Sequence, residues 1–451
     1  MTKFSPVVSD SPNILLINPW IHDFAAYDYW AKPLGLLYLA SILRTHGCNI
    51  SYIDCLNRFH PDLNKTISSK QDGRGSYLKT HISKPKGLDD IPRNYSRYGI
   101  LPEWFKKDLL ALKQPDIVFI TSHMTYWYPG VFETIDIIRK IFPSVPVILG
   151  GIYASLCHDH ALKYSGADKV IAGEGEKVVL ELVKEYTGFS SSIKFDPEEL
   201  DSYPYPAFDL ENKISFIPIL SSKGCPFSCA YCASGYLNKK RMLRSTESLI
   251  EEIIYWHEKY EVIDFALYDD AFLLDANNHA IPLLEEIIES DIKVRFHTPN
   301  ALHIRELSEN TAKLMFKAGF ETIRLGLETT LFDKDRFDNK VSEYEFKQNL
   351  IFLREAGFSK NQIGAYLMAG LPDQDEKNVI ESMQKVAESK ITPIPVYYTP
   401  IPHTALWEKA VQCSRYDLTS DPIFTNNSIL PCRKAGFSWE MVSFLKKLAA
   451  S

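Results

Sequence analysis

Short apolar runs rich in β-branched residues alternate with longer segments of helical period along most of this 451-residue chain. The runs predict strands and the segments between them predict helices. A first series of strands is expected at 13–18, 49–54, 116–121, 146–150 and 169–172. A second series is expected at 215–221, 262–268, 293–297, 322–327, 362–368 and 395–399. Because strands that alternate with helices form parallel sheets, the sequence predicts an α/β protein with two such sheets.

The two series are separated by a segment of serines, acidic residues and three prolines, which is typical of an extended linker. The first series predicts a doubly wound, Rossmann-like domain, and the six βα units of the second predict a partial (β/α)6 TIM-like barrel. An insertion without clear period, at about 57–101, is expected to be a functional lid or a mobile segment. The predicted divisions are a first domain at 1–189, a linker at 190–212, the barrel at 213–404 and a short C-terminal helical extension at 405–451.

Charge and composition exclude several classes of protein. Fifty basic and 57 acidic side chains leave a net charge of -7, so no nucleic-acid partner is expected. The longest apolar stretch, at about 34–43, is roughly half of a membrane span, and the first residues do not resemble a secretory signal. We therefore expect a cytoplasmic protein with no membrane span. Eight cysteines are too few for a disulfide scaffold, and in a reducing compartment clustered cysteines favour metal binding.

Three cysteines follow the first strand of the second series with the spacing C-x3-C-x2-C: Cys225, Cys229 and Cys232. Three thiolates on one loop can bind three irons of a [4Fe–4S] cluster and leave the fourth iron open to a substrate or cofactor. The alternatives are a structural zinc site and chance clustering. Zinc usually takes four protein ligands, and neither a fourth cysteine nor a nearby histidine follows.

The cysteine motif, with an aromatic residue before its third cysteine, resembles that of the radical S-adenosylmethionine (SAM) enzymes. The resemblance implies that the open iron binds the amino and carboxylate groups of SAM and that cluster reduction yields a 5′-deoxyadenosyl radical. It also implies SAM contacts from the cysteine loop and from the ends of the following strands. A glutamate at such a place can equally be solvated or ion-paired. The implied contacts are Tyr231, near the adenine, with Asp269, Asp270, Asn300, Arg324, Glu328 and Met368.

The first domain resembles the cobalamin (B12)-binding domain that precedes the barrel in a subgroup of these enzymes. Its small residues at predicted strand ends would let a corrin ring approach the backbone, and Ser122 or Thr125 could bond the nucleotide tail. The alternative is a generic doubly wound domain whose glycines only make turns. The D-x-H-x-x-G motif for a lower axial histidine is absent, so the lower cobalt ligand stays open. The implied contacts are Leu34, Gly35, Ser122, His123, Met124, Thr125, Gly150, Gly151, Ala154, Gly173, Glu174 and Gly175.

Together the two resemblances imply an enzyme that uses a [4Fe–4S] cluster, SAM and cobalamin. Its expected reaction is methylation of an unactivated carbon of a small molecule, with an electron donor such as flavodoxin or ferredoxin. The alternatives are cyclisation or ring rearrangement without methyl transfer, a transfer-RNA methylthiotransferase, and a sensor without turnover. The methylthiotransferase would need further N-terminal cluster cysteines, which this chain lacks.

Overall fold

The computed structural model describes residues 11–64, 67–332, 336–338, 341–434 and 438–450. Its contacts divide the chain into two compact units. Unit 1 comprises Met1–Ile214 with Asp421–Ile423, and unit 2 comprises Ser215–Ser420 with Phe424–Ser451. The main division falls close to the predicted start of the barrel, but the short Asp421–Ile423 segment of the C-terminal part belongs to unit 1.

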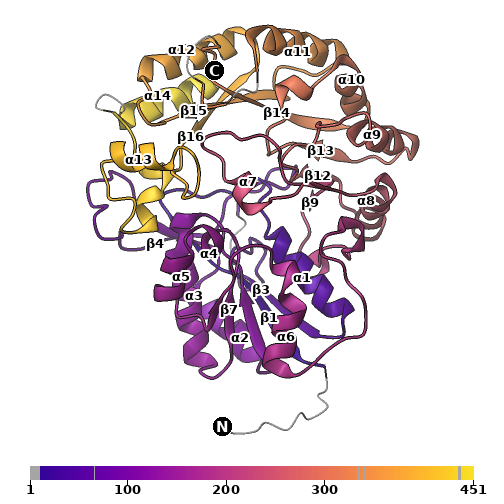
Figure 1. Ribbon diagram of the computed structural model, residues 1–451, viewed down its shortest axis with the longest axis vertical. Helices are drawn as coiled ribbons and strands as arrows, with labels where there is room; N and C mark the ends of the chain where they lie inside the picture. The colour runs from indigo at the N-terminus through magenta and orange to yellow at the C-terminus, as the bar shows by residue number, and fades with distance from the viewer. Residues whose placement is uncertain (1–10, 65–66, 333–335, 339–340, 435–437, 451) are drawn as a thin grey trace. The chain divides into compact units, whose positions relative to one another are not determined.

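Unit 1 is built on a five-stranded parallel sheet of order β3-β1-β6-β7-β8. Helices α1 and α6 cover one face, and α2, α3 and α5 cover the other (Figure 1). Apolar residues from the second face, such as Leu15, Val118 and Val147, pack with Phe105 and Ile135 in one core. The strands are β1 (Asn13–Asn18), β3 (Asn49–Asp54), β6 (Ile117–Ile120), β7 (Val147–Leu149) and β8 (Lys169–Val170), and the helices are α1 (Leu34–Thr45), α2 (Pro102–Ala111), α3 (Tyr128–Ile141), α4 (Ile152–Leu156), α5 (His158–Tyr164) and α6 (Val179–Thr187).

The strand order makes unit 1 doubly wound, as the sequence predicts. The chain passes from β1 to β3 on one side, and β6 then pairs with β1 on the other. Such a reversal leaves a crevice at the carboxyl ends of the strands, which is where open α/β sheets bind ligands. The carboxyl edge of β1 and β6 is therefore the place in unit 1 to look for a binding site.

The predicted insertion at about 57–101 contains ordered structure. A small antiparallel sheet of order β2-β5-β4 joins β2 (Ile21–Asp23), β5 (Ser96–Tyr98) and β4 (Lys79–His81). Arg58 forms a buried ion pair with Asp28, with Nη1 to Oδ2 at 2.7 Å. The insertion is thus held to the segment after β1 by strand pairing and by a buried charge pair.

The predicted linker packs on unit 1 along much of its length. Arg44 of α1 pairs with Asp209, with Nη1 to Oδ2 at 2.7 Å, and the Ser41 hydroxyl donates to the Tyr205 carbonyl. Lys32 Nζ lies 2.7 Å from Glu211 Oε2, and both side chains are largely buried. The composition predicted an extended linker, and the segment instead makes two short 3-10 turns, at Leu200–Ser202 and Phe208–Leu210, and packs through polar contacts.

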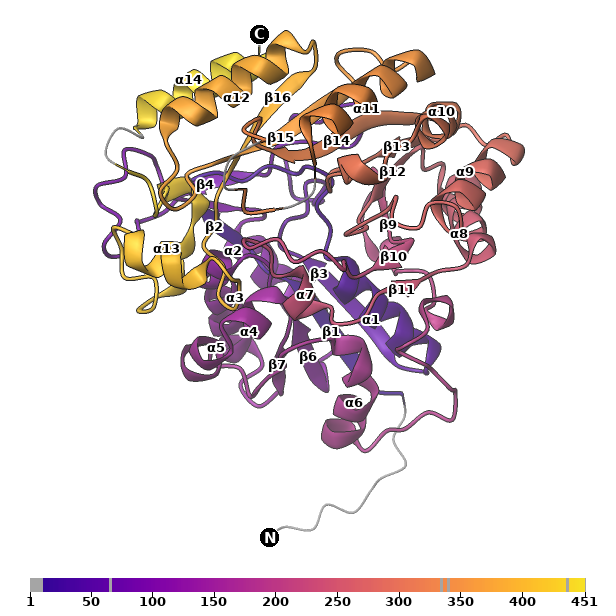
Figure 2. The same ribbon diagram turned by 45° about the horizontal axis from the view of Figure 1, so that its top comes forward.

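Unit 2 is a six-stranded parallel sheet in which the strands follow one another in chain order. The strands form an arc with helices on its outer side (Figure 2), which is the arrangement of a partial barrel. The strands are β9 (Ile217–Ile219), β12 (Asp264–Leu267), β13 (Arg295–His297), β14 (Phe320–Glu328), β15 (Ile363–Ala369) and β16 (Thr392–Tyr397), and the outer helices are α8 (Thr246–Tyr260), α9 (Ala280–Glu289), α10 (Glu309–Lys317), α11 (Glu343–Ala356) and α12 (Glu376–Glu388).

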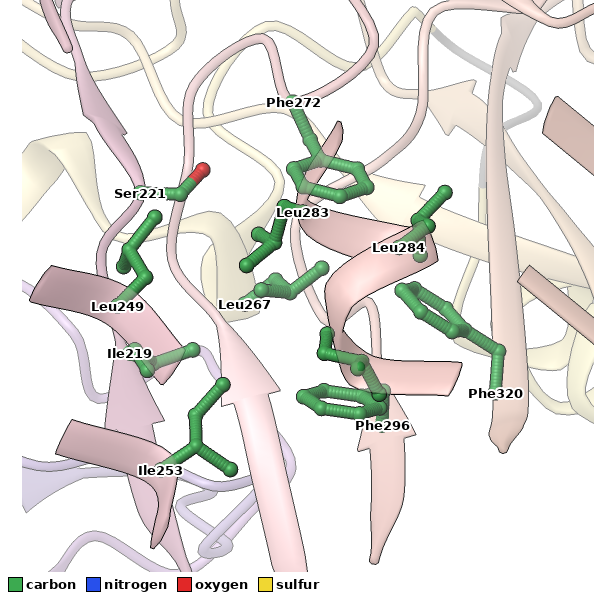
Figure 3. Close-up of a pocket in the computed structure, with 11 residues that line it drawn as sticks. Ile219, Ser221, Leu249, Ile253, Leu267, Phe272, Leu283, Leu284, Phe296 and Phe320 are labelled. Carbon is green, nitrogen blue, oxygen red and sulfur yellow. The ribbon is translucent and has the colours of Figure 1, made fainter. Parts of the chain in front are cut away.

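The core of unit 2 between the first strands and helices α8 and α9 is apolar and closely packed. A cavity of about 10 Å³ remains there, about the size that holds one water molecule. Figure 3 shows its shell of leucine, isoleucine and phenylalanine side chains, with Ser221 as the polar member at one end. This region is stabilised by apolar packing. Its polar residue, Ser221, directly precedes the strand from which the cysteine loop starts.

The C-terminal part adds two helices to unit 2. Helix α13 (Trp407–Cys413) contributes Ala410 to a core with Met368 and Cys432, and α14 (Trp439–Ala450) packs against β16 and α12. Among the described residues, no helix is both long enough and apolar enough to cross a bilayer.

Candidate active site and cofactor-binding edges

The three motif cysteines lie on one loop at the carboxyl edge of the barrel sheet. The loop leaves the short strand β10 (Ser222–Lys223) and returns through α7 (Ser234–Leu237) to β11 (Met242–Leu243), which pairs with β10. Gly224 begins the loop with φ of 89°, and a Cβ there would lie 2.7 Å from the Lys240 carbonyl oxygen. The chain therefore needs glycine at this entry to the loop.

The surroundings of the thiols differ along the loop. Cys229 is buried, Cys225 is half-buried and Cys232 is exposed. The Ser234 amide donates to Cys232 Sγ at 3.4 Å, and Cys225 Sγ lies 3.8 Å from His303 Nε2. N–H donors directed at cysteine sulfurs are among the groups that set the properties of iron–sulfur clusters, so this donor set fits a cluster.

No three His, Cys, Asp or Glu side chains in the described ranges gather closely enough to hold a single metal ion. In a cubic cluster each thiolate binds a different iron.

A buried polar network anchors the start of the cysteine loop. Asp269 follows β12, and its Oδ1 accepts hydrogen bonds from the Ser221 hydroxyl at 2.5 Å and the Ser222 hydroxyl at 2.6 Å. Its Oδ2 accepts the Ser221 amide at 3.2 Å, and His279 Nε2 lies 2.8 Å from the Ser221 hydroxyl. Burial raises the pKa of Asp269, while the hydrogen bonds from Ser221 and Ser222 oppose that rise. Asp269 thus holds the residues immediately before the loop.

The neighbouring predicted SAM contacts also hold the backbone of this edge. Asp270 Oδ2 accepts the Gly224 amide at 3.1 Å, so this carboxylate fixes the entry to the loop. Asn300, after β13, donates from Nδ2 to the Tyr268 carbonyl at 2.9 Å. The structure brings Asp269, Asp270 and Asn300 to one edge, and their direct contact with SAM stays a prediction.

We expect Asp269→Asn to loosen the cysteine loop. In asparagine an NH₂ group, which can only donate, replaces one of the two carboxylate oxygens that now accept hydrogen bonds. At least one buried donor would therefore lose its acceptor. The expected loss in free energy of unfolding is about 1–3 kcal/mol, together with reduced iron retention after reconstitution. Thermal unfolding and iron analysis measure both effects. Asp291→Asn, at an exposed position of the same unit, is the matched control, and equal iron content in the two variants would contradict the anchoring role.

A cavity of about 440 Å³ lies beside the cysteine loop, at the ends of β14 and β15. Three of the predicted SAM contacts line it: Tyr231 from the loop, Glu328 from β14 and Met368 from β15. Burial raises the pKa of Tyr231, and the charge of Glu328 and a hydrogen bond with it add to the rise. The loop that carries the cysteines and the ends of two barrel strands therefore form one cavity.

The cavity also has polar lining residues that the sequence did not indicate, among them Arg336, Asp338, Gln374 and Lys409. Arg336, Asp338 and Gln374 lie on the connections after β14 and β15, where neither periodicity nor a strand end marks a position, and Lys409 lies on helix α13. The sequence L-P-D-Q after β15 is typical of a turn and could have indicated Gln374. In this turn the Gln374 side chain accepts the Gly370 amide at 2.7 Å and donates to the Met368 carbonyl at 2.8 Å.

Arg324 is placed differently from the other predicted contacts. It lies midway along β14, and its Nη1 donates to the Ile323 carbonyl at 3.0 Å and to the Gln362 carbonyl at 3.3 Å. Gln362 precedes β15, so the guanidinium points toward the amino end of the sheet. Arg324 is not among the residues that line the cavity.

In unit 1, several of the predicted cobalamin contacts meet at the carboxyl edge of β6, β7 and β8. The Ser122 hydroxyl donates to the Gly150 carbonyl at 2.6 Å and accepts the Ala154 amide at 3.2 Å. The Ser155 hydroxyl donates to the Gly151 carbonyl at 2.8 Å and accepts the Gly173 amide at 2.9 Å. These bonds join the loops after three strands into one rigid edge, and they use the Ser122 side chain internally.

Three of the predicted glycines present bare backbone at this edge. A Cβ added at Gly35, Gly150 or Gly173 would meet no atom within 4 Å. Helix α1 leads directly into β3, which is parallel to β1, so its first residues, Leu34 and Gly35, lie at the carboxyl edge as well. A broad, flat ligand can approach the backbone closely where glycines leave no side chain in the way. The edge therefore fits a corrin ring.

The remaining predicted contacts frame the same edge. Burial lowers the pKa of His123 to about 4, so its imidazole is neutral at pH 7. Met124 is exposed and Thr125 is buried. Glu174 pairs with Lys177, with Oε2 to Nζ at 2.6 Å, and a Cβ at Gly175 would lie 3.2 Å from Leu39. Gly175 therefore packs on α1, while Glu174 already has an ionic partner.

Comparison with known proteins identifies the family of each unit. Residues 219–386 match the family model described as the Radical SAM superfamily, and residues 107–183 match that of the B12 binding domain. The chain belongs to the radical SAM enzymes that carry a B12-binding domain. The predicted fold class, an N-terminal doubly wound domain followed by a partial barrel, is confirmed.

Relatives of known name include methyltransferases and cyclases. The chain is 25% identical over 332 residues to an uncharacterized methyltransferase, PH0819, of Pyrococcus horikoshii, covering 66% of this chain and 70% of the relative. It is 24% identical over 360 residues to the anaerobic magnesium-protoporphyrin IX monomethyl ester cyclase of Cereibacter sphaeroides, covering 70% of this chain and 57% of the relative.

A solved structure has the same fold. It is the radical S-adenosylmethionine methyltransferase TsrM from Kitasatospora setae, with cobalamin and a [4Fe–4S] cluster bound. It superimposes with a TM-score of 0.63 at 18% identity, over 89% of this chain and 78% of that one.

Proposed function

We propose that this enzyme methylates an unactivated carbon of a small molecule with the help of a [4Fe–4S] cluster, SAM and cobalamin. The observation that carries the proposal is the shared wall of the cysteine loop and the 440 Å³ cavity, because Tyr231 belongs to both. A ligand in the cavity would thereby lie next to the metal-binding loop. The bare glycine edge of unit 1 supports a second, broad ligand, and the methyltransferase relatives support methyl transfer as the reaction.

In this proposal each group of residues has a distinct task. Cys225, Cys229 and Cys232 hold the cluster, and Asp269 and Asp270 keep their loop in place through Ser221, Ser222 and Gly224. Tyr231, Glu328 and Met368 bind the adenosine part of SAM in the cavity. When bound, the cluster with SAM supplies a carbon-centred radical that removes a hydrogen atom, and cobalamin supplies the methyl group.

The polar walls of the cavity suit a nucleoside. Glu328 offers a carboxylate to hydroxyl donors, and Asn378 adds an amide group, while Met368 and Leu371 supply an apolar face for a flat ring. A reductant is required as well, and a flavodoxin or ferredoxin of the cytoplasm would provide single electrons at a low potential.

The proposal is tested with protein reconstituted without oxygen. About four irons and one cobalamin per chain are expected, and addition of dithionite and SAM should release 5′-deoxyadenosine. SAM labelled in its methyl group should also give about one equivalent of S-adenosylhomocysteine per cobalamin, because the methyl group leaves SAM in a separate event. Protein that binds cluster and SAM but releases no 5′-deoxyadenosine would contradict the proposed activity.

A second candidate function is cyclisation without methyl transfer, which the similarity to the monomethyl ester cyclase of Cereibacter sphaeroides supports. The same experiment separates the two candidates. A cyclase should release 5′-deoxyadenosine and form no S-adenosylhomocysteine, with the label recovered in methionine and unreacted SAM. A methyltransferase should form S-adenosylhomocysteine as well, because the label leaves SAM.

A further inference from the structure

Glu328, the carboxylate at the end of β14, has an unusual backbone conformation. Its φ is 65°, a left-handed value that a non-glycine residue rarely adopts. The Thr329 amide donates to the Leu327 carbonyl at 2.7 Å, so Glu328 is the central residue of a γ-turn of the rarer, positive-φ kind. The pairing of β14 with β15 shifts register between Gly326 and Glu328. The strand thus ends in a strained turn that directs one side chain away from the regular course of the sheet.

One guanidinium holds the peptide groups on both sides of this turn. Arg336 donates from Nη2 to the Leu327 carbonyl at 2.7 Å and from Nη1 to the Thr329 carbonyl at 2.8 Å. The rigid fork of an arginine suits two carbonyl oxygens at a fixed separation. A strained backbone conformation persists only where surrounding contacts hold it in place. The two bonds from Arg336 hold the residues on both sides of Glu328.

Arg336 is itself fixed by a buried carboxylate. Asp338 accepts from Arg336 Nε at 2.9 Å and from Nη2 at 3.1 Å, and the two side chains are 1% and 7% exposed, respectively. The residue between them, Phe337, accepts the Ala230 amide of the cysteine loop at 3.0 Å. The segment 336–338 therefore connects the cysteine loop with the end of β14, and it lines the same cavity as Glu328 and Tyr231.

We propose that Arg336, held by Asp338, is a positioning residue that fixes the left-handed turn at Glu328 and so sets the Glu328 carboxylate in the cavity. The inference rests on the proposed function only in taking SAM as the ligand of the cavity. The turn itself is a property of the chain alone and can be tested without any ligand.

The first test measures the turn by hydrogen exchange of the reconstituted holoenzyme. In Arg336→Gln we expect faster exchange of the Thr329 amide, because the Leu327 carbonyl that accepts it is no longer held. Asp338→Asn, which keeps the shape of the buried side chain, should increase this exchange to a smaller extent. Arg354→Gln is the matched control, since that guanidinium also donates to a backbone carbonyl, that of Ser389, elsewhere in unit 2. Unchanged exchange at Thr329 in both Arg336→Gln and Asp338→Asn would overturn the proposal.

The second test measures binding of radiolabelled SAM by equilibrium dialysis. Arg336→Gln and Glu328→Gln should each weaken binding by about tenfold, the effect of one charge-assisted hydrogen bond. If Arg336 acts through Glu328, the double variant should bind no more than about twofold more weakly than Glu328→Gln alone. Losses that multiply in the double variant would overturn the proposal, because Arg336 would then contact SAM itself or act by general destabilisation.

The two tests separate this inference from the proposed function. If the wild-type holoenzyme binds no SAM, the proposed function fails, and the exchange measurement still decides whether Arg336 holds the turn. If Glu328→Gln weakens SAM binding and Arg336→Gln does not, the proposed function survives and the positioning role is overturned.

Discussion

Replacement of Cys229 with alanine is expected to lower the iron content from about four per chain to below one, with cobalamin unchanged. Cys229 is the middle cysteine of the motif and the most buried of the three. Two remaining thiolates cannot retain a cluster that three hold in place. The backbone bond from the Cys232 amide to the Cys229 carbonyl, 3.0 Å long, does not involve the side chain, so the loop should keep its course. Iron analysis and the charge-transfer absorbance in the visible range measure the loss of the cluster, and cobalamin absorbance measures the cofactor that is retained.

The control for this experiment is a cysteine in the same unit but outside the loop. Cys413 lies on α13 and is partly buried, so Cys413→Ala removes a thiol with a comparable loss of apolar contact. We expect it to retain the full iron content and to release 5′-deoxyadenosine. Equal iron in Cys229→Ala and wild-type protein would show that the loop does not bind the cluster.

Replacement of Gly151 with alanine is expected to have the reciprocal effect, with cobalamin lost and iron retained. Gly151 has φ of 95°, and an added Cβ would lie 2.3 Å from the Ser122 carbonyl oxygen and 2.6 Å from its amide nitrogen. The backbone would have to move, and the bond from the Ile152 amide to the Ser122 carbonyl, now 2.7 Å, would break. We expect a loss of about 2–4 kcal/mol in free energy of unfolding.

Gly150→Ala separates the fold of this edge from its binding role. Gly150 precedes Gly151 but has ordinary φ and open space around its Cβ position. Gly150→Ala should therefore leave the unfolding temperature unchanged and weaken cobalamin binding, since the new methyl group would occupy the space proposed for the ligand. Calorimetry and cobalamin absorbance test the pair. Unaltered unfolding of Gly151→Ala would contradict the steric argument, and full cobalamin binding by Gly150→Ala would contradict the proposed location.

The barrel and the cysteine loop could be predicted because their signals are local. Each of the six barrel strands is a short apolar run next to a helix of clear period, and all six overlap the predicted ranges, although β16 begins three residues before its predicted start at 395. The small sheet of β2, β5 and β4 was missed because each strand has three residues, too few for a period, and because β2 pairs with a segment far along the chain.

The details of the site depended on contacts that a sequence does not display. Asp269 was predicted to contact SAM, and the structure shows it buried against two serine hydroxyls whose direction no pattern reveals. The left-handed turn at Glu328 depends on a guanidinium in a later loop, because bonds from side chains to distant carbonyls leave no periodic trace.

Tyr231 is flanked by two of the three cysteines and also forms part of the cavity wall. If the cavity binds the nucleoside of SAM as proposed, this shared residue links metal incorporation to nucleoside binding, because an ordered loop favours both events. Apoprotein should then take up iron more readily when the nucleoside is already present, and the same factor should describe how much more tightly the metal-loaded protein retains that nucleoside.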